Sequence, residues 1–419
     1  MQALIRLALL GISLIATLAA PAVFSDDLQN AIRVEIERLR ISGQLSLGDV
    51  HIASGDLLAE LYERRNFQPA WTTTAQIDSL LAAIEDSYLE GFNPADYNLE
   101  KIRLAQQLLS NKLLPHQRAV IDLAFTDSLI RLGYHHRFGK VNPYNLDAHW
   151  NFVRELSTQD SVTLIQQAID DANIHKTLAD LFPQVSVYAR LEEALAKYRQ
   201  LAADGGWPVI PGGPLIKPGG TDERLPLISQ RVHISGDLPS PANTTSTLYD
   251  ETLQAAIRRF QFRHGLAEDG VMGPATFAAM NVSVEHRIDQ IRASLERARW
   301  AVYSIPDDYI IVNIAGFSAR LVRDRATVWE TKAVVGIEYH KTPVFRGDVK
   351  YVVLNPTWTV PYSIATKEML PRIKQDPTSY FAERDFDIKD KAGRLVNSAD
   401  VDWQQLSRGN FGYTFIQRP

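Results

Sequence analysis

The residue types that support covalent catalysis are scarce in this sequence. None of the 419 residues is a cysteine, which excludes a thiolate nucleophile within the chain. No Gly-x-Ser-x-Gly, His-Glu-x-x-His or Ser-x-x-Lys motif occurs, so these serine-nucleophile and zinc-protease signatures are absent. His340, beside Lys341-Thr342-Pro343, has the chemistry of a general base, but a lone histidine in a loop is more often a surface residue. The sequence therefore assigns no catalytic residue.

Adjacent histidines, His135 and His136, raise the question of a metal site. Neighbouring side chains point to different sides of a helix or strand, and no third ligand follows at metal-site spacing. We expect no metal ion here.

A proline-rich motif can present side chains without reacting itself. It reads Asn355-Pro356-Thr357-Trp358-Thr359-Val360-Pro361 and follows an apolar run. Proline fixes φ and favours an extended residue before it. Two prolines around an aromatic residue therefore predict a stiff loop that holds the aromatic side chain toward a ligand. The alternative is that Trp358 only covers the core at a sheet edge.

The elements around these residues change character along the chain. Hydrophobic spacing of three and four residues predicts helices from Asp56 to Tyr198. Gly205 to Gly220 is dense in glycine and proline, which predicts a domain boundary or a wrapping loop. Trp207 within it is expected to be a packed anchor rather than a platform for a ligand. A compact unit follows: a helix over 249–264 capped by Asp250 or Thr247, turns, and a second helix opening at Gly273-Pro274.

A further helix is expected to end near Trp300, with Ile288, Ile291 and Leu295 facing inward. From Asp308 the pattern is that of strands: 309–314, 319–322, 328–335 and 350–354, with a hairpin turn at Asp324-Arg325 and a helix inserted over 364–374.

Composition sets the broad class. Hydrophobic residues make up 45% and charged residues 22%, as in globular proteins, and the length favours two to three domains. A net charge of −5 gives no support to nucleic-acid binding. Arg6, the apolar run 7–19 and Ala20-Pro21-Ala22 read as a secretory signal peptide cleaved near Ala22, rather than a membrane anchor, because the run is too short to span a bilayer.

Two sets of residues resemble known families. Gly265-Leu266, Asp269-Gly270 and Gly273-Pro274-Ala275-Thr276, after the 249–264 helix, resemble the helical peptidoglycan-binding module. Gly336, Thr342-Pro343-Val344-Phe345 and the Asn355–Pro361 motif resemble the YkuD-type L,D-transpeptidase catalytic domain. With the helical region before them, the order is similar to the large periplasmic L,D-transpeptidases.

This resemblance implies an α+β multidomain fold: a helical scaffold, a small helical peptidoglycan-binding module and an incomplete, mostly-β catalytic domain. The expected division is a signal peptide over 1–22, scaffold 26–221, module 222–281, connecting helix 282–305 and the N-terminal part of the catalytic domain over 306–419. The resemblance also implies substrate-binding roles for Asn355, Trp358 and Pro361, and neither a metal nor an organic cofactor.

The family's reaction needs a residue that is missing here. Its members use a cysteine, in a Ser-x-Gly-Cys-x-Arg signature, to form 3-3 cross-links between peptidoglycan stem peptides. We expect those positions to lie beyond Pro419, which makes the chain an inactive fragment. The alternatives are a non-catalytic peptidoglycan-binding or scaffolding protein and a natural pseudoenzyme. The resemblance implies a periplasmic protein with peptidoglycan and cell-wall synthases as partners.

Overall fold

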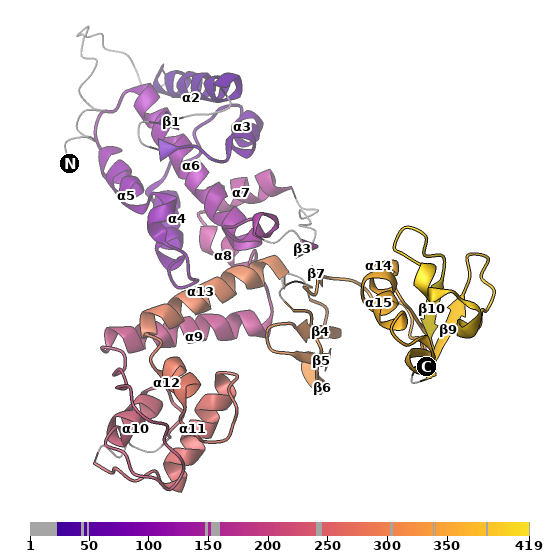
Figure 1. The fold of residues 1–419 in the computed structure, drawn as a ribbon. Coiled ribbons are helices and arrows are strands. Elements are labelled where there is room, and N and C mark those ends of the chain that lie inside the picture. The colour runs from indigo at the N-terminus through magenta and orange to yellow at the C-terminus, as the bar shows by residue number, and fades with distance from the viewer. Residues whose placement is uncertain are drawn as a thin grey trace. The chain divides into compact units, whose positions relative to one another are not determined.

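The computed structural model describes residues 23–42, 46–47, 50–146, 150–151, 160–239, 245–301, 305–337, 339, 341–382 and 384–418. The predicted signal peptide and His340 lie outside these residues. The chain forms two compact units, Met1–Phe345 and Arg346–Pro419, and each is described by itself. The mixture of a helical N-terminal part with small sheets toward the C-terminus confirms the predicted α+β class (Figure 1).

The N-terminal part of the first unit is a helical bundle, as the sequence predicted. Its core is continuous from Ile32 to Leu195 and includes Leu295 of a later helix. Its helices are α2 (Val23–Ser42), α3 (Gly55–Arg64), α4 (Thr74–Asp86), α5 (Leu99–Leu108), α6 (Pro115–Phe138), α7 (Ser161–Asp170), α8 (Ile174–Ala179) and α9 (Ser186–Ala203). In the described part of the chain, no helix combines the length and apolar character that a bilayer span needs.

Short elements complete this bundle. They are the strand pair β1 (Ser46–Leu47) and β2 (Val50–His51), and the 3-10 turns η1 (Pro94–Tyr97) and η2 (Pro143–Asn145). Thr73 caps α4 in a reciprocal capping box with Gln76, which satisfies two otherwise unpaired N–H groups.

A buried polar network joins α3 to α6 inside the bundle. Tyr62 and Asp122 are fully or nearly fully buried, and the Asp122 carboxylate also accepts from the backbone N–H groups of Ala70 and Trp71. Burial raises the pKa of the Asp122 carboxyl, while these hydrogen bonds oppose the rise. Every partner in this network belongs to the scaffold.

Helix α13 (Val284–Ala301) returns the chain to the scaffold and packs beside α9 (Figure 1). Leu295 is fully buried, and Ile288 and Ile291 pack against the same core. The predicted inward face of this helix is therefore confirmed. Its arginines reach back as well: Arg292 donates to the Gly91 carbonyl at 2.8 Å and Arg299 to the Glu90 carbonyl at 2.6 Å.

Between α9 and α13 lies a small helical module with its own core. It contains α10 (Leu225–Ile234), α11 (Glu251–Arg263) and α12 (Pro274–Met280). Asp250 caps α11 by accepting from the Leu253 N–H at 2.8 Å, which decides between the two predicted caps. Helix α10 was not predicted.

The entry and exit of this module are held together. The Trp207 indole donates to the Val282 carbonyl at 3.0 Å. Ile210 and Asn281 exchange two hydrogen bonds, Ile210 N–H to the Asn281 side-chain oxygen at 2.8 Å and the Asn281 amide to the Ile210 carbonyl at 2.9 Å. Trp207 also stacks under the guanidinium of buried Arg231 at 3.9 Å, so its predicted role as a packed anchor is confirmed.

After α13 the first unit ends in a three-stranded antiparallel sheet in the order β4-β5-β6. The strands are β4 (Tyr309–Asn313), β5 (Ser318–Arg323) and β6 (Ala326–Lys332). Asp324 and Arg325 both have positive φ and form the hairpin turn that the sequence predicted. A parallel pair, β3 (Trp150–Asn151) with β7 (Val344–Phe345), joins the bundle to the segment after this sheet.

The second unit is a sheet in the order β8-β10-β9 with helical turns around it. The strands are β8 (Trp358–Thr359), β9 (Phe386–Lys389) and β10 (Thr414–Gln417). The predicted helix over 364–374 is present as α14 (Tyr362–Ile364), a π turn over Ala365–Met369 and α15 (Leu370–Ile373), followed by α16 (Pro377–Ala382). Pro371 lacks an N–H, and the adjacent π turn accommodates the lost helical bond.

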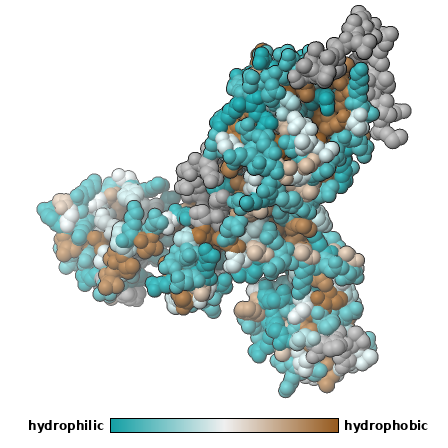
Figure 2. Space-filling view, turned by 180° about the vertical axis from the view of Figure 1, so that it is seen from behind, coloured by the Kyte–Doolittle hydropathy of each residue, from teal (hydrophilic) through white to brown (hydrophobic). Residues whose placement is uncertain are grey.

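One predicted strand is wrong. Residues 350–354 have no strand structure, and the side chains of Tyr351, Val352, Val353 and Leu354 are 58% to 84% exposed. Their β-branched and aromatic composition favours a strand, but a strand is stable only in a ladder, and none of the described strands pairs with this segment. Hydrophobic surface is correspondingly visible on the C-terminal part of the chain in the space-filling view (Figure 2).

Candidate functional site

The three candidate substrate-binding residues lie in the second unit, at the start of its sheet. Asn355 precedes β8 with a φ of 47°, in the left-handed region that asparagine tolerates. Trp358 begins β8, and Pro361 occupies the N-cap position of α14. All three are exposed, so the motif is open to a ligand.

Backbone pairing with β10 fixes this motif. Trp358 pairs with Gln417 and Thr359 with Ile416, and the Val360 N–H donates to the Phe415 carbonyl at 2.8 Å. Val360 is buried in the core of the unit while Trp358 is 46% exposed on the edge strand. The edge position agrees with the alternative interpretation of Trp358, yet half of its ring remains available to a ligand.

Sequence reasoning missed Tyr362, which directly follows Pro361. Its hydroxyl donates to the Arg408 carbonyl, and its ring packs edge-on against Phe411 with 6.1 Å between centroids. The Tyr362 ring is 51% exposed. Two half-exposed aromatic rings thus lie on either side of Val360 in the chain. The signal was present in the sequence as an aromatic directly after the second proline.

These groups can bind but not perform acyl transfer. Rings stack on sugar or peptide groups, and the exposed Asn355 amide can donate and accept hydrogen bonds. The motif contains no cysteine, and it contains no basic side chain that could activate its threonine hydroxyls. The candidate roles of Asn355, Trp358 and Pro361 stay predictions.

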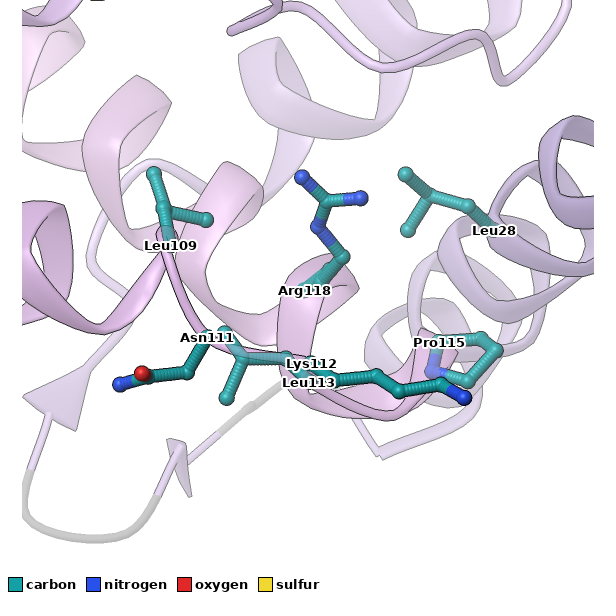
Figure 3. A pocket seen from close by; sticks show the side chains of 7 residues that line it. All are labelled: Leu28, Leu109, Asn111, Lys112, Leu113, Pro115 and Arg118. Atoms are coloured by element: carbon teal, nitrogen blue, oxygen red, sulfur yellow. The ribbon is translucent and has the colours of Figure 1, made fainter. Parts of the chain in front are cut away.

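The described residues form a small pocket elsewhere, in the scaffold (Figure 3). Its volume is about 210 Å³ and it is lined by Leu28, Leu109, Asn111, Lys112, Leu113, Pro115 and Arg118. None of the three candidate residues lines it. Within the described ranges no group of three or more potential metal ligands comes together.

The adjacent histidines take separate structural positions. His135 Nδ1 lies 2.9 Å from the Tyr97 hydroxyl, while His136 stacks between Phe92 and Phe182 with centroid distances of 5.3 and 4.2 Å. Burial lowers the pKa of His135 to about 4 and that of His136 well below its ordinary value.

Comparison with known protein families gives a match in each part of the chain. Residues 56–195 match the scaffold domain, and residues 234–280 match the family described as "Putative peptidoglycan binding domain". Residues 307–413 match the L,D-transpeptidase catalytic domain. Part by part, the chain is therefore similar to a scaffold domain, a peptidoglycan-binding domain and the L,D-transpeptidase catalytic domain.

A curated protein supports this relationship. The "Putative L,D-transpeptidase" of Haemophilus influenzae is 34% identical over 104 residues, which is 24% of this chain and 21% of that protein. The match thus spans about a fifth of the relative's length. The catalytic-domain match covers the β4–β6 sheet and most of the unit with Trp358, ends before β10, and contains no cysteine.

Proposed function

We propose that the protein acts in the bacterial cell wall, where it binds peptidoglycan and takes part in L,D cross-linking of stem peptides. The observation that carries this proposal is the order of the three family matches, scaffold, peptidoglycan binding and L,D-transpeptidase, along one chain. The residues of the predicted signal peptide support a periplasmic location.

The family reaction is a double acyl transfer. A cysteine thiolate attacks the carbonyl of the third stem residue, the terminal residue leaves as an amine, and an acceptor amine then displaces the thiol. The 419 residues contain no cysteine, so the binding steps are the part of this reaction that they support. Trp358 and Tyr362 supply the exposed aromatic surface for a stem peptide.

The lack of a cysteine also favours a second candidate. In it, the chain is a non-catalytic peptidoglycan-binding or scaffolding protein that holds the wall for a separate synthase. Both candidates require peptidoglycan binding. They differ in whether the protein takes part in the cross-linking or only holds the wall for a separate synthase.

Binding is tested by co-sedimentation of the whole 419-residue protein with purified sacculi. Phe262 on α11 is 68% exposed within the matched binding domain, so Phe262→Ala is expected to weaken recovery about tenfold, the effect of removing one aromatic anchor. Leu89→Ala, at a 58% exposed scaffold position, is the matched control and is expected to bind as wild type. Equal wild-type recovery with and without sacculi contradicts the proposal.

A further inference from the structure

Glu90, His136 and Arg299 form a charged cluster where the scaffold meets α13. His136 and Arg299 are buried, and the Glu90 side chain is 22% exposed. Glu90 Oε2 lies 3.3 Å from His136 Nε2. The Arg299 side chain is 1% exposed, stacks over Phe92 at 4.0 Å and binds the Glu90 carbonyl. The cluster thus combines an acid, a base and a cation on elements far apart in sequence.

Helix α13 binds the Glu90-Gly91 turn through hydrogen bonds from two of its arginines. Arg292 and Arg299, two turns apart on α13, donate to the carbonyls of Gly91 and Glu90. Gly91 has a φ of +88°, and a Cβ there would lie 3.3 Å from Leu295, so the turn fits closely under the helix. Both arginines bind backbone carbonyls, so a change at the Glu90 side chain reaches these contacts through the backbone of the turn.

Other ionisable groups face this pair from every neighbouring helix. They are Asp86 on α4, His135 on α6, His175 on α8, Tyr188 and Glu192 on α9, and Glu296 on α13. Asp86 is paired with His175 at 2.8 Å and Glu296 with Arg299 at 3.4 Å. Arg299 is the cation that attracts Glu90, whereas Asp86 and Glu192 repel its ionised form.

We propose that proton binding at the Glu90–His136 pair controls how tightly α13 holds the Glu90-Gly91 turn of the scaffold. With its proton, the Glu90 carboxyl donates to the neutral imidazole of His136 and carries no charge. Without it, the ionised carboxylate, whose Oε2 is buried, is driven toward water, because desolvation outweighs its attraction to Arg299.

The direction of the pH effect follows from both groups. Burial raises the pKa of Glu90 to about 8. Protonated Glu90 therefore stabilises the contact between α13 and the Glu90-Gly91 turn at low pH, and this stabilisation is lost as pH rises through about 8. The lowered pKa of His136 has the opposite effect. Neutral His136 stabilises the contact at higher pH, and this stabilisation is lost as pH falls below the ordinary histidine pKa. The contact is therefore expected to weaken between pH 6.5 and 8.5.

Hydrogen exchange of the whole 419-residue protein, with mass-spectrometric readout and correction for intrinsic rates, tests this at pH 6.5 and 8.5. Peptides covering 284–301 should lose protection about tenfold at the higher pH. Peptides from α11, in the separate core of the module, serve as the internal reference. Equal protection of 284–301 at both pH values, relative to α11, overturns the proposal.

Two variants sharpen the test. Glu90→Gln keeps the shape and cannot ionise, so its 284–301 peptides should keep the same protection at both pH values. Glu285→Gln, at an exposed position on α13, should retain the wild-type loss. A wild-type pH response in Glu90→Gln shows that another group titrates and refutes the assignment. If Glu90→Gln does not fold, the proposal is judged on the wild-type protein alone, by whether protection of 284–301 falls between pH 6.5 and 8.5. The experiment uses no peptidoglycan, so its outcome is independent of the proposed function.

Discussion

The hydroxyl of Tyr62 donates to a carboxylate oxygen of Asp122 at 2.5 Å, and this bond links α3 to α6 in the dry interior of the scaffold. The same hydroxyl lies 2.7 Å from Thr126 Oγ1. A buried hydrogen bond to a carboxylate is stronger than one between neutral groups, so this contact determines how the two helices pack.

Replacing Tyr62 by phenylalanine is expected to destabilise the scaffold by about 2 kcal/mol, because the buried Asp122 carboxylate loses one of its donors while packing is preserved. Urea unfolding followed by tryptophan fluorescence measures the change. Tyr351→Phe, at a position 81% exposed, is the control and should leave the midpoint unchanged. An unchanged midpoint in Tyr62→Phe contradicts the role given to this bond.

Asp250→Ala should destabilise the small helical module by about 1 kcal/mol through loss of the α11 cap. Asp250→Asn keeps a side-chain oxygen for the Leu253 N–H and should recover most of the loss. Protection of the 251–263 peptides in hydrogen exchange reports on this helix alone. Identical behaviour of the alanine and asparagine variants would argue against capping.

Gly139→Ala should destabilise the contact between α6 and α13. Gly139 has a φ of +75°, and an added Cβ would lie 2.5 Å from Glu296 Oε1 and 2.6 Å from Trp300 Nε1. The control is Gly205→Ala, where φ is +97° and nothing lies within 4 Å of the added carbon. Gly205→Ala should cost about 1 kcal/mol from backbone strain alone, and Gly139→Ala clearly more in the same thermal melt. Equal losses would mean that the clash is relieved at no cost.

Carbapenems acylate the enzymes of this family at the catalytic cysteine, so the 419-residue polypeptide should gain no mass when incubated with one. Intact-protein mass spectrometry is the measurement, with a cysteine-bearing L,D-transpeptidase as the positive control. One stoichiometric adduct on this chain would reveal a nucleophile that neither the sequence nor the site geometry identifies.

Local signals were enough to predict much of the fold. The Asp250 cap, the Gly273-Pro274 helix start and the Asp324-Arg325 turn each depend on a few adjacent residues, and the structure contains them all. Helix α10 was missed because it follows a glycine- and proline-rich stretch, although Pro226 in its first turn is itself typical of a helix start. Its burial against α11 outweighs these local signals.

Features that depend on distant residues could not be predicted. Segment 350–354 has strand composition, but pairing needs a partner that composition does not reveal. The environment of His136 depends on Glu90 and Phe182, which a linear pattern does not bring together. The candidate site was found through a contiguous motif, whereas Tyr362 was overlooked because its contacts, Arg408 and Phe411, lie about forty residues or more downstream.

The paired hydrogen bonds between Ile210 and Asn281 have a consequence for how this protein can be rebuilt. Because the chain enters and leaves the small module at one point, residues 211–280 are a cassette inserted into the hairpin of α9 and α13. Removing the cassette and joining its ends with a short glycine-rich turn is therefore expected to preserve that hairpin and its shared core. The scaffold helices α9 and α13 therefore offer a single insertion point, at which we expect another module with neighbouring ends to be accepted.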